Sequence, residues 1–381
     1  MIDLAAARET FEGASDFTVG LEEEFALIDP ETLQLVPRFE DLKVAGQADD
    51  LLADSIAGEL ISSEIEIRSG AGADIADARG RQQEARRRLF ALARGQGVAL
   101  GSTGTHPLSD YREQLIIDTE HYHRVEDGLK YVAWRNNTFS VHVHVGVRGA
   151  DRAVRVCDRL RPVLPILLAV SANSPYIDGR DSGLHSGRTQ TFTKSFPRCG
   201  VPDAFGGWAA WSDYVELLVR TGSIVEFTQL WWSVRPHHSF GTVEVRICDA
   251  QTTATEADAL AELIVGCVRR AAAEVDAGET PPDLPGRLIG ENVWRAIRHG
   301  LDGRLLDLDA AAGGGLAAIG EYPAEEALDR LNAWAGTDVV LPERNGAQRQ
   351  RALIESGAGP AEVYAECVRE TQATYSQETV R

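Results

Sequence analysis

Three consecutive glutamates, Glu22, Glu23 and Glu24, stand within an otherwise apolar stretch at residues 17–28. The β-branched and aromatic residues around them favour a strand, in which alternate side chains share a face. Glu22 and Glu24 therefore point together and Glu23 points away. Two carboxylates at roughly 4 Å repel each other by about 1 kcal/mol in water and by about 4 kcal/mol at an effective dielectric of about 20. The pattern predicts a compensating hard cation, Mg²⁺ or Mn²⁺. A solvated strand face is the alternative, and the apolar flanks argue against it.

A second pair of carboxylates lies in the stretch 58–70. Glu64 and Glu66 alternate there with Ile65 and Ile67, which is the pattern of a half-buried strand. Both carboxylates would share one face of that strand. Taken alone, an amphipathic edge strand with its polar side in water explains the pattern equally well.

Two histidines alternate with valines in the stretch 138–147, so His142 and His144 share a face of a predicted strand. Such a pair could bind zinc, bind an oxygen-rich metal site or contact a phosphate. A single histidine in a core is usually structural, but two in strict alternation are much less often so.

A carboxylate and a guanidinium alternate in the stretch 241–249, where Glu244 and Arg246 share a face. They could form a simple ion pair. They could also divide two tasks, with Glu244 on a metal and Arg246 on a phosphate that the metal bridges. A further predicted strand at residues 224–234 runs directly into Arg235.

Two loops add candidate ligand-binding residues. The tight loop 104–107 contains Thr105 and His106 and follows a short predicted strand, a position at which loops often hold ligands. An ordinary glycine–proline turn is the alternative. The long polar segment 171–188 ends at Arg188 and has the composition of a functional lid.

The composition bounds the kind of protein. The chain has 381 residues, of which 44% are hydrophobic, and its net charge of -20 gives no sign of a nucleic-acid or membrane-surface partner. The five cysteines are scattered without a C-x-x-C pair, which argues against a zinc ribbon or a disulfide framework. The N-terminal residues lack the pattern of a signal peptide, and no apolar run is long enough to span a bilayer. These features predict a cytoplasmic protein.

Four predicted strands that each carry polar groups on one face predict an α+β fold. A curved, mainly antiparallel sheet would have one wet, functional face, and helices would cover the other. We expect a single catalytic domain over residues 1–381, with a sheet-bearing core at 17–250 and a mostly helical part at 251–381. Residues 111–134 and 151–172 are each predicted to be helical, the second bent by Pro162 and Pro165. The chain has no phosphate-binding loop of the G-x-x-x-x-G-K-[ST] type, so ATP would have to bind at the sheet. A carboxylate-rich face that holds two or more hard cations, with arginines at its edge, could do so.

Together these motifs resemble those of the carboxylate-amine ligases of the glutamate–cysteine ligase type 2 family. They follow the family's order over about residues 17–300. The matching stretches are Gly20-Leu-Glu-Glu-Glu-Phe25, Gly104-Thr-His-Pro107, His142-Val-His-Val-Gly146, Ser171-Ala-Asn-Ser-Pro175 with Gly179-Arg180, Trp232-Ser-Val-Arg-Pro236, Gly241-Thr-Val-Glu-Val-Arg-Ile-Cys-Asp249 and Trp294-Arg-Ala-Ile-Arg-His-Gly300. The resemblance implies a glutamine-synthetase-like catalytic fold that binds ATP with Mg²⁺ at the mouth of its sheet.

The resemblance also implies a reaction. ATP would phosphorylate a substrate carboxylate, expected to be the γ-carboxylate of glutamate. The amine of the second substrate, expected to be cysteine, would then attack the acyl phosphate to give an amide, ADP and phosphate. The physiological acid and amine are not identified by the resemblance. Family members are often dimers, so a homodimer is expected.

Site residues are implied in the same way. Arg246 and Arg235 are the implied catalytic residues, Arg246 as the group that stabilises the phosphoryl charge. Arg235 and Arg188 are candidates for binding substrate carboxylates or phosphates. The implied metal ligands are Glu22, Glu24, Glu66 and Glu244, and the implied substrate- or ATP-binding residues are His142, His144, Arg188, Thr105 and His106. Glu64 stands where an uncharged residue is expected in relatives, so no role is implied for it.

Two other functions fit parts of the pattern. A metal-dependent amide hydrolase can also carry His-x-His on a strand, although such enzymes usually have further His or Asp ligands downstream. A non-catalytic ATP-binding protein of the same fold is the other alternative. ATP dependence separates the ligase from the hydrolase, and turnover separates it from the non-catalytic protein.

Overall fold

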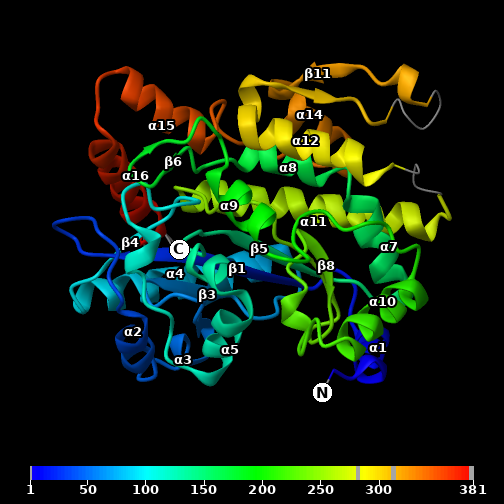
Figure 1. Cartoon of the computed structure of the whole chain (residues 1–381), viewed down its shortest axis with the longest axis horizontal. Coiled ribbons are helices and arrows are strands. Elements are labelled where there is room, and N and C mark those ends of the chain that lie inside the picture. The colour runs from blue at the N-terminus through cyan, green and yellow to red at the C-terminus, as the bar shows by residue number, and fades with distance from the viewer. Residues whose placement is uncertain (1, 280–283, 310–314, 377–381) are drawn as a thin grey trace.

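A computed structural model describes residues 2–279, 284–309 and 315–376 (Figure 1). At its centre is a seven-stranded sheet in the order β2-β3-β1-β5-β9-β8, with β4 paired to the far end of β1. All of its strand pairs are antiparallel. The strands are β1 (Val19–Ile28), β2 (Ile56–Ala57), β3 (Glu64–Arg68), β4 (Ala99–Gly101), β5 (Val141–Gly146), β8 (Val234–His237) and β9 (Thr242–Val245).

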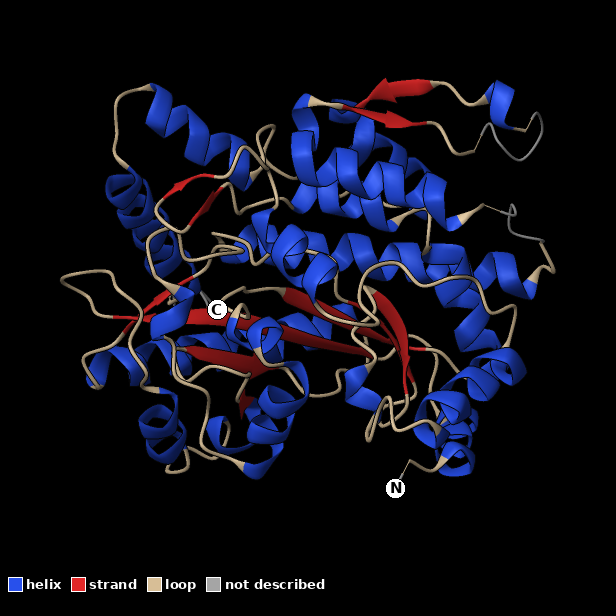
Figure 2. Ribbon diagram, in the orientation of Figure 1, coloured by secondary structure: helices blue, strands red, loops and turns tan. Residues whose placement is uncertain are grey.

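Helices make up most of the remainder, and Figure 2 shows them around the sheet. They are α1 (Leu4–Gly13), α2 (Phe39–Gly46), α3 (Leu52–Ser55), α4 (Ile75–Gly95), α5 (Glu120–Leu129), α6 (Tyr131–Trp134), α7 (Ala150–Leu160), α8 (Leu164–Ser171), α9 (Gly187–Ser195), α10 (Trp208–Arg220), α11 (Ala254–Asp276), α12 (Gly286–His299), α14 (Ala327–Ala335), α15 (Gly346–Glu355) and α16 (Pro360–Tyr375). Two small hairpins, β6–β7 (Tyr176–Ile177, Arg180–Asp181) and β10–β11 (Arg304–Leu306, Glu321–Pro323), lie outside the main sheet.

Three helices cover one face of the sheet. α4 packs on β1 and β3, α11 packs on β5, and α7 packs on β8 and β9. α8, α12 and α14 form a further layer beyond α11 (Figure 1). The apolar side chains on this face of the strands pack against the helices. Val143, Val145 and Val243, for example, are buried in one core with residues of α7 and α11. Full burial of such a side chain contributes roughly 1.5–3 kcal/mol. The predicted α+β class is therefore confirmed.

One predicted strand is wrong. Residues 224–234 were expected to be extended, but they contain a 3₁₀ turn at Phe227–Gln229, and β8 begins only at Val234. The physical reason is that Nη1 of Arg235 donates hydrogen bonds to the main-chain carbonyls of Thr228 (3.3 Å) and Leu230 (2.8 Å). These carbonyls are therefore occupied by a side chain instead of a neighbouring strand.

Two helical predictions differ from the structure in their breaks. The segment 111–134, predicted as one helix, is divided into a 3₁₀ turn, α5 and α6, because Thr119 caps α5 and Lys130 adopts a positive φ of 51°. The predicted helix at 151–172 is interrupted between α7 and α8 near its prolines, as expected. None of the described helices is long and apolar enough to cross a membrane.

A buried ion-pair network joins β1 to the helices behind it. Glu23 points into the helical side, where the Arg86 guanidinium donates to its two carboxylate oxygens at 2.5 and 2.8 Å. Nη1 of Arg86 donates to Asp258 of α11 at 2.8 Å, and Gln82 donates to Glu23 at 2.7 Å. The Arg86 side chain is only 2% exposed. Because Arg86 is the buried cation that joins Glu23 to Asp258, the network is a point at which the fold is sensitive to charge.

Arg86→Met tests this network. The substitution keeps most of the side-chain volume but leaves Glu23 buried without its cation, and it leaves Asp258 with only the partly exposed Arg79. We expect a loss of about 3–5 kcal/mol in the free energy of unfolding, measured by urea denaturation. Arg79→Met is the matched control, because Arg79 also pairs with Asp258 but is 37% exposed. A loss of less than 1 kcal/mol in Arg86→Met, or an equal loss in the control, would contradict the role given to the network.

Candidate active site

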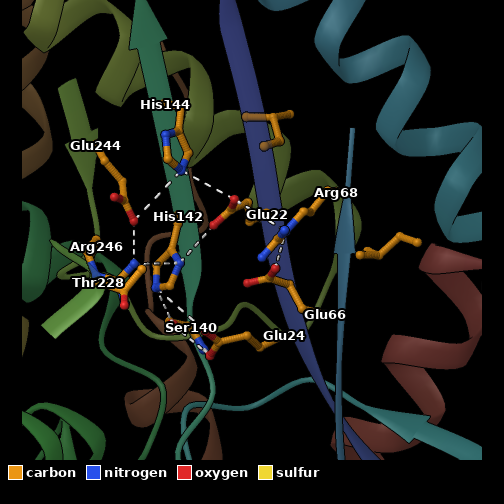
Figure 3. Close-up of polar contacts among 12 residues, drawn as sticks. Glu22, Glu24, Glu66, Arg68, Ser140, His142, His144, Thr228, Glu244 and Arg246 are labelled. Atoms are coloured by element: carbon orange, nitrogen blue, oxygen red, sulfur yellow. Dashed lines mark hydrogen bonds and ion pairs between the residues drawn. The ribbon is translucent and has the colours of Figure 1, made fainter. Parts of the chain in front are cut away.

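The strand register brings the predicted polar residues together on the face away from α4, α7 and α11. Glu24 lies opposite Glu66 across β1 and β3, and Glu22 lies opposite His142 across β1 and β5. His144 lies opposite Glu244 across β5 and β9. Residues directly opposite in antiparallel strands have Cβ atoms about 4.5–5.5 Å apart, so their side chains meet. Figure 3 shows them converging on one volume.

A pocket of about 350 Å³ lies over these side chains. Its floor is the sheet, and its walls come from the segment before β3, from α5, from α9 and from the segment before β8. The side chains that line it include Glu22, Glu24, Glu59, Glu64, Glu66, Arg68, Tyr122, Asn136, Thr138, Ser140, Arg188, Phe192, Phe196, Trp231, Arg235, His237, Phe240, Glu244 and Arg246.

Glu22 is the centre of the site. Its carboxylate oxygens lie 3.3 Å from Nδ1 of His142, 3.4 Å from Nε2 of His144 and 3.5 Å from Nε of Arg68. Burial acts to raise its pKa, but the charge of His144 and the contact with His142 outweigh burial and hold the pKa well below its usual range. Glu22 is therefore ionised and faces cationic or polarisable groups on three sides.

Glu24 is fixed by a residue that follows no obvious motif. Its Oε2 accepts from the main-chain N–H of Ser140 at 2.5 Å and from the Ser140 hydroxyl at 2.7 Å. The same hydroxyl lies 2.7 Å from Nε2 of His142. Ser140 thus sets the orientation of a carboxylate on β1 and of an imidazole on β5 at once.

The carboxylates contributed by β3 and by the segment before it have too few cations nearby. Nε of Arg68 donates to Glu66 at 2.5 Å, yet burial and the charge of Glu22 still raise the pKa of Glu66 well above its usual value. Burial and the charge of Glu24 likewise raise the pKa of Glu64 well above its usual value, and they raise that of Glu59 to about 7. Oε2 of Glu64 is buried and has no hydrogen-bond partner among the described residues.

Glu244 is held between two arginines at the other side of the site. Nε of Arg235 donates to it at 2.6 Å, and Nη1 of Arg246 donates to its other oxygen. Burial acts to raise the pKa of Glu244, but Arg235 and Arg246 hold it well below its usual range. Nη1 of Arg246 also lies 3.3 Å from Nδ1 of His142, so the guanidinium lines the pocket between Glu244 and the imidazole (Figure 3).

Three groups of side chains on this face could each hold a metal ion. In every group the possible ligand atoms lie within 4.8 Å of one another. The groups are Glu22 with Glu66 and His142, Glu22 with His144 and Glu244, and Glu24 with Glu59 and Glu66. Each contains at most one histidine and otherwise carboxylates, which is a donor set for a hard cation such as Mg²⁺ or Mn²⁺. Nε2 of His144 lies 3.4 Å from Glu22 and 3.8 Å from Glu244, the two carboxylates of its group.

The remaining predicted arginines have main-chain partners. Arg235 is bound to Glu244 and to the carbonyls of the preceding segment. Arg188, in the first turn of α9, lines the pocket, and its guanidinium donates to the carbonyls of Ile247 and Arg246 at 3.1 Å each. Both side chains therefore border the site while supporting its frame.

Thr105 and His106 do not lie in the pocket lining. The Thr105 hydroxyl donates to the carbonyl of Tyr176 at 2.9 Å. Nδ1 of His106 accepts from the N–H of Ser109 at 2.9 Å, so its Nε2 donates to the carbonyl of Leu33 at 2.7 Å. Both side chains are therefore buried and bonded to main-chain groups outside this pocket.

Sequence reasoning missed three residues of the site. Arg68 follows Glu66 by two positions on the same strand face, a spacing that could have placed it beside the carboxylates. Glu59 precedes β3 without strand alternation, so nothing in its immediate neighbours set it apart from a surface glutamate. Ser140 was visible only as a residue two positions before His142, on the same face of the predicted strand. That spacing could have placed it next to the histidine.

Comparisons with known proteins agree with this geometry. Residues 18–377 match the model of Glutamate-cysteine ligase family 2. Among curated relatives, "Putative glutamate--cysteine ligase 2-2" of Rubrobacter xylanophilus is 37% identical over 96% of this chain and 94% of its own length. "Putative glutamate--cysteine ligase 2" of Sorangium cellulosum is 41% identical over 76% of this chain and 77% of its own length.

Solved structures share the fold at low identity. The glutamate–cysteine ligase of Francisella tularensis, crystallised in complex with AMP, matches with a TM-score of 0.68 at 11% identity, over 96% of this chain and 91% of that one. A bifunctional glutathione synthetase from Pasteurella multocida matches with a TM-score of 0.65 at 11% identity, over 97% of this chain. This chain spans about half (53%) of the length of that bifunctional protein. The resemblance inferred from the sequence motifs is confirmed: the chain belongs to Glutamate-cysteine ligase family 2.

Proposed function

We propose that this protein is an ATP-dependent ligase that joins the γ-carboxylate of glutamate to the amine of cysteine through an acyl phosphate. The observation that carries the proposal is the carboxylate cage, by which we mean Glu22, Glu24, Glu66 and Glu244, with the Arg246 guanidinium at its edge. Family membership supports the choice of reaction and of substrates.

The cage would hold Mg²⁺ or Mn²⁺, with His142 and His144 beside it. When bound, these ions would neutralise the triphosphate and align it for transfer. A carboxylate oxygen of glutamate would attack the γ-phosphorus of ATP and release ADP. The amine nitrogen would then attack the acyl carbon, lose its proton and release phosphate, which leaves the amide.

The arginines of the site would have different tasks. Arg246 lines the pocket beside Glu244 and His142, so it is placed to stabilise the charge of the transferred phosphoryl group. Arg235 is committed to Glu244 and to main-chain carbonyls, so its proposed task is to keep Glu244 ionised and oriented. Phe192, Phe196 and Trp231 line the same pocket as Arg246 and give it an apolar wall, where uncharged parts of the substrates would pack.

The metal-dependent hydrolase is the less favoured alternative. Zinc hydrolases usually bind their metal through several histidines, whereas each candidate group in the described residues offers at most one. The cage also contains more carboxylates than a single zinc ion needs. A non-catalytic ATP-binding protein would not need Arg246 at the edge of the cage.

The small-molecule substrates and the state of the cysteines support a cytoplasmic location. All five cysteines are free, which suits a reducing compartment where ATP is available. A homodimer remains part of the proposal from the family resemblance, and light scattering of the purified protein tests it.

The proposed reaction is tested by ADP release with ATP and Mg²⁺, using glutamate together with a panel of amines. We expect ADP only when both acid and amine are present, with cysteine among the accepted amines and an amide of the matching mass. Each substrate is omitted in turn as the control. Amide hydrolysis with metal alone, and no ADP with any pair, would support the hydrolase instead.

Glu24→Gln and Arg246→Ala test the assignment of the site. Each should lower kcat at least about 100-fold, because Glu24→Gln removes a proposed metal ligand and Arg246→Ala removes the cation proposed to stabilise the transferred phosphoryl group. Circular dichroism should show an intact fold. Arg295→Ala is the control, since Arg295 pairs with Glu291 and Glu321 outside the pocket and should keep full activity. Retained turnover in both site variants would remove this assignment.

Metal binding can be read without turnover. Mn²⁺ added to the metal-stripped protein should bind at the cage, as followed by electron paramagnetic resonance. Glu66→Gln and Glu244→Gln should each weaken that binding by at least about 10-fold, because each removes a carboxylate ligand. Glu226→Gln, at the pocket mouth beside His121, is the matched control and should bind like the wild type. Equal affinity in all variants would place the metal elsewhere.

A further inference from the structure

Asp249 lies just beyond β9 and is completely buried. Its Oδ2 accepts from the main-chain N–H of Asn173 at 2.8 Å and from the hydroxyl of Ser174 at 2.6 Å. Its Oδ1 accepts from the hydroxyl of Ser186 at 2.8 Å. Asp249 is not part of the pocket lining. The proposed reaction therefore assigns this buried carboxylate no direct task.

The partners of Asp249 hold the beginning of α9. Ser186 is the N-cap of that helix, and its hydroxyl accepts from the N–H of Thr189 at 3.1 Å. The Ser174 hydroxyl accepts from the N–H of Arg188 at 3.0 Å. A carboxylate near these N–H groups is also favoured by the positive end of the helix dipole. Asp249 therefore fixes the first turn of α9 against the sheet.

Arg188 connects Asp249 to the main chain that borders the pocket. Its Nη1 lies 4.0 Å from Asp249 and donates to the carbonyl of Ile247, while its Nη2 donates to the carbonyl of Arg246. The planar guanidinium presents these donors in a fixed geometry, which a lysine cannot reproduce. The Arg188 side chain therefore holds the main chain at Arg246, and Asp249 in turn holds Arg188.

We infer that Asp249 is a positioning residue, which acts through Arg188 to hold the main chain of Arg246 so that the Arg246 guanidinium stays beside Glu244 at the edge of the carboxylate cage. The inference rests on the proposed function, because it takes Arg246 as the group that stabilises the transferred phosphoryl charge. It gives Arg188 a supporting task instead of direct substrate binding.

The loop 104–107 shows how closely Asp249 is enclosed. A Cβ added at Gly104 would stand 2.7 Å from Cγ of Asp249, too close for any real contact. The Gly104 N–H also donates to the carbonyl of Asn173, whose own N–H binds Asp249. Glycine is therefore required at 104 to let the loop pass the carboxylate, and Gly104→Ala provides a second way to displace Asp249.

The test compares Asp249→Asn, Arg188→Lys and Gly104→Ala in steady-state ADP release. Asp158→Asn is the matched control, because Asp158 is also buried and binds main-chain N–H groups, those of Phe205 and Gly206, but lies outside the active-site pocket. We expect kcat to fall at least about 10-fold in all three variants. KM for ATP and the affinity for Mn²⁺ should stay within about 2-fold, since the cage lies on other side chains.

The double variant Asp249→Asn/Arg188→Lys should be no slower than the worse single variant, because both residues act on the same group. The control should keep its kcat even if its melting temperature falls as much as that of Asp249→Asn. Unchanged kcat in Asp249→Asn and Arg188→Lys, multiplicative losses in the double variant, or an equal loss of kcat in the control would overturn the inference. Where Asp249→Asn does not fold, Ser186→Ala replaces it.

Hydrogen–deuterium exchange separates this inference from the proposed reaction. If the wild type turned over no substrate pair, the proposed function would fail, but exchange would still report on the positioning of Arg246. Asp249→Asn should raise deuterium uptake both at 186–190 and at 244–249. Increased uptake at 186–190 alone would show that α9 is not coupled to the strand end, which would overturn the inference.

Discussion

Repulsion among carboxylates is the constraint on which this structure depends. The antiparallel register places Glu22, Glu24, Glu66 and Glu244 on one buried face, where like charges interact strongly. The cationic side chains that neutralise these carboxylates are unevenly distributed. Glu244 has two arginines and Glu22 has two histidines and an arginine, whereas Glu64 and Glu66 share few cations and have raised pKa values. The part of the face near β3 is therefore where an additional positive charge would be most stabilising.

The same alternation has a cost on the other side of the sheet. Because Glu22 and Glu24 face the pocket, Glu23 must enter the helical core, and Arg86 is buried there to neutralise it. The geometry of the cage and the stability of the core are thus linked through a single strand. A change on either face of β1 alters the electrostatics of both.

Strand alternation predicted which side chains share a face of the sheet. It placed Glu22, Glu24, Glu66, His142, His144, Glu244 and Arg246 on shared faces before any neighbours were known, because the period of two is a local property. The order of the strands, the pairing of Glu23 with Arg86 and the role of Ser140 depend on contacts distant in sequence, so no local pattern reveals them. The strand prediction for residues 224–234 was wrong for a related reason. Their apolar composition suits a strand, but the Arg235 guanidinium donates to two of their carbonyls. The hydrogen bonds of His106 to the main chain of Leu33 and Ser109 and its place outside the pocket lining likewise depend on contacts that its motif does not reveal.

The last described helix packs against the first strand. Tyr375 of α16 contacts the rings of Phe25 in β1 and Phe90 in α4, and Tyr364 lies beside the loop that contains His106. On the ribosome, β1 emerges long before α16 is made. Until α16 has been synthesised, β1 lacks one of its packing partners. Its apolar side chains are then exposed to chaperones and to non-native pairing. Because Glu244 lies far along the chain from Glu22, the cage itself can be completed only late in synthesis.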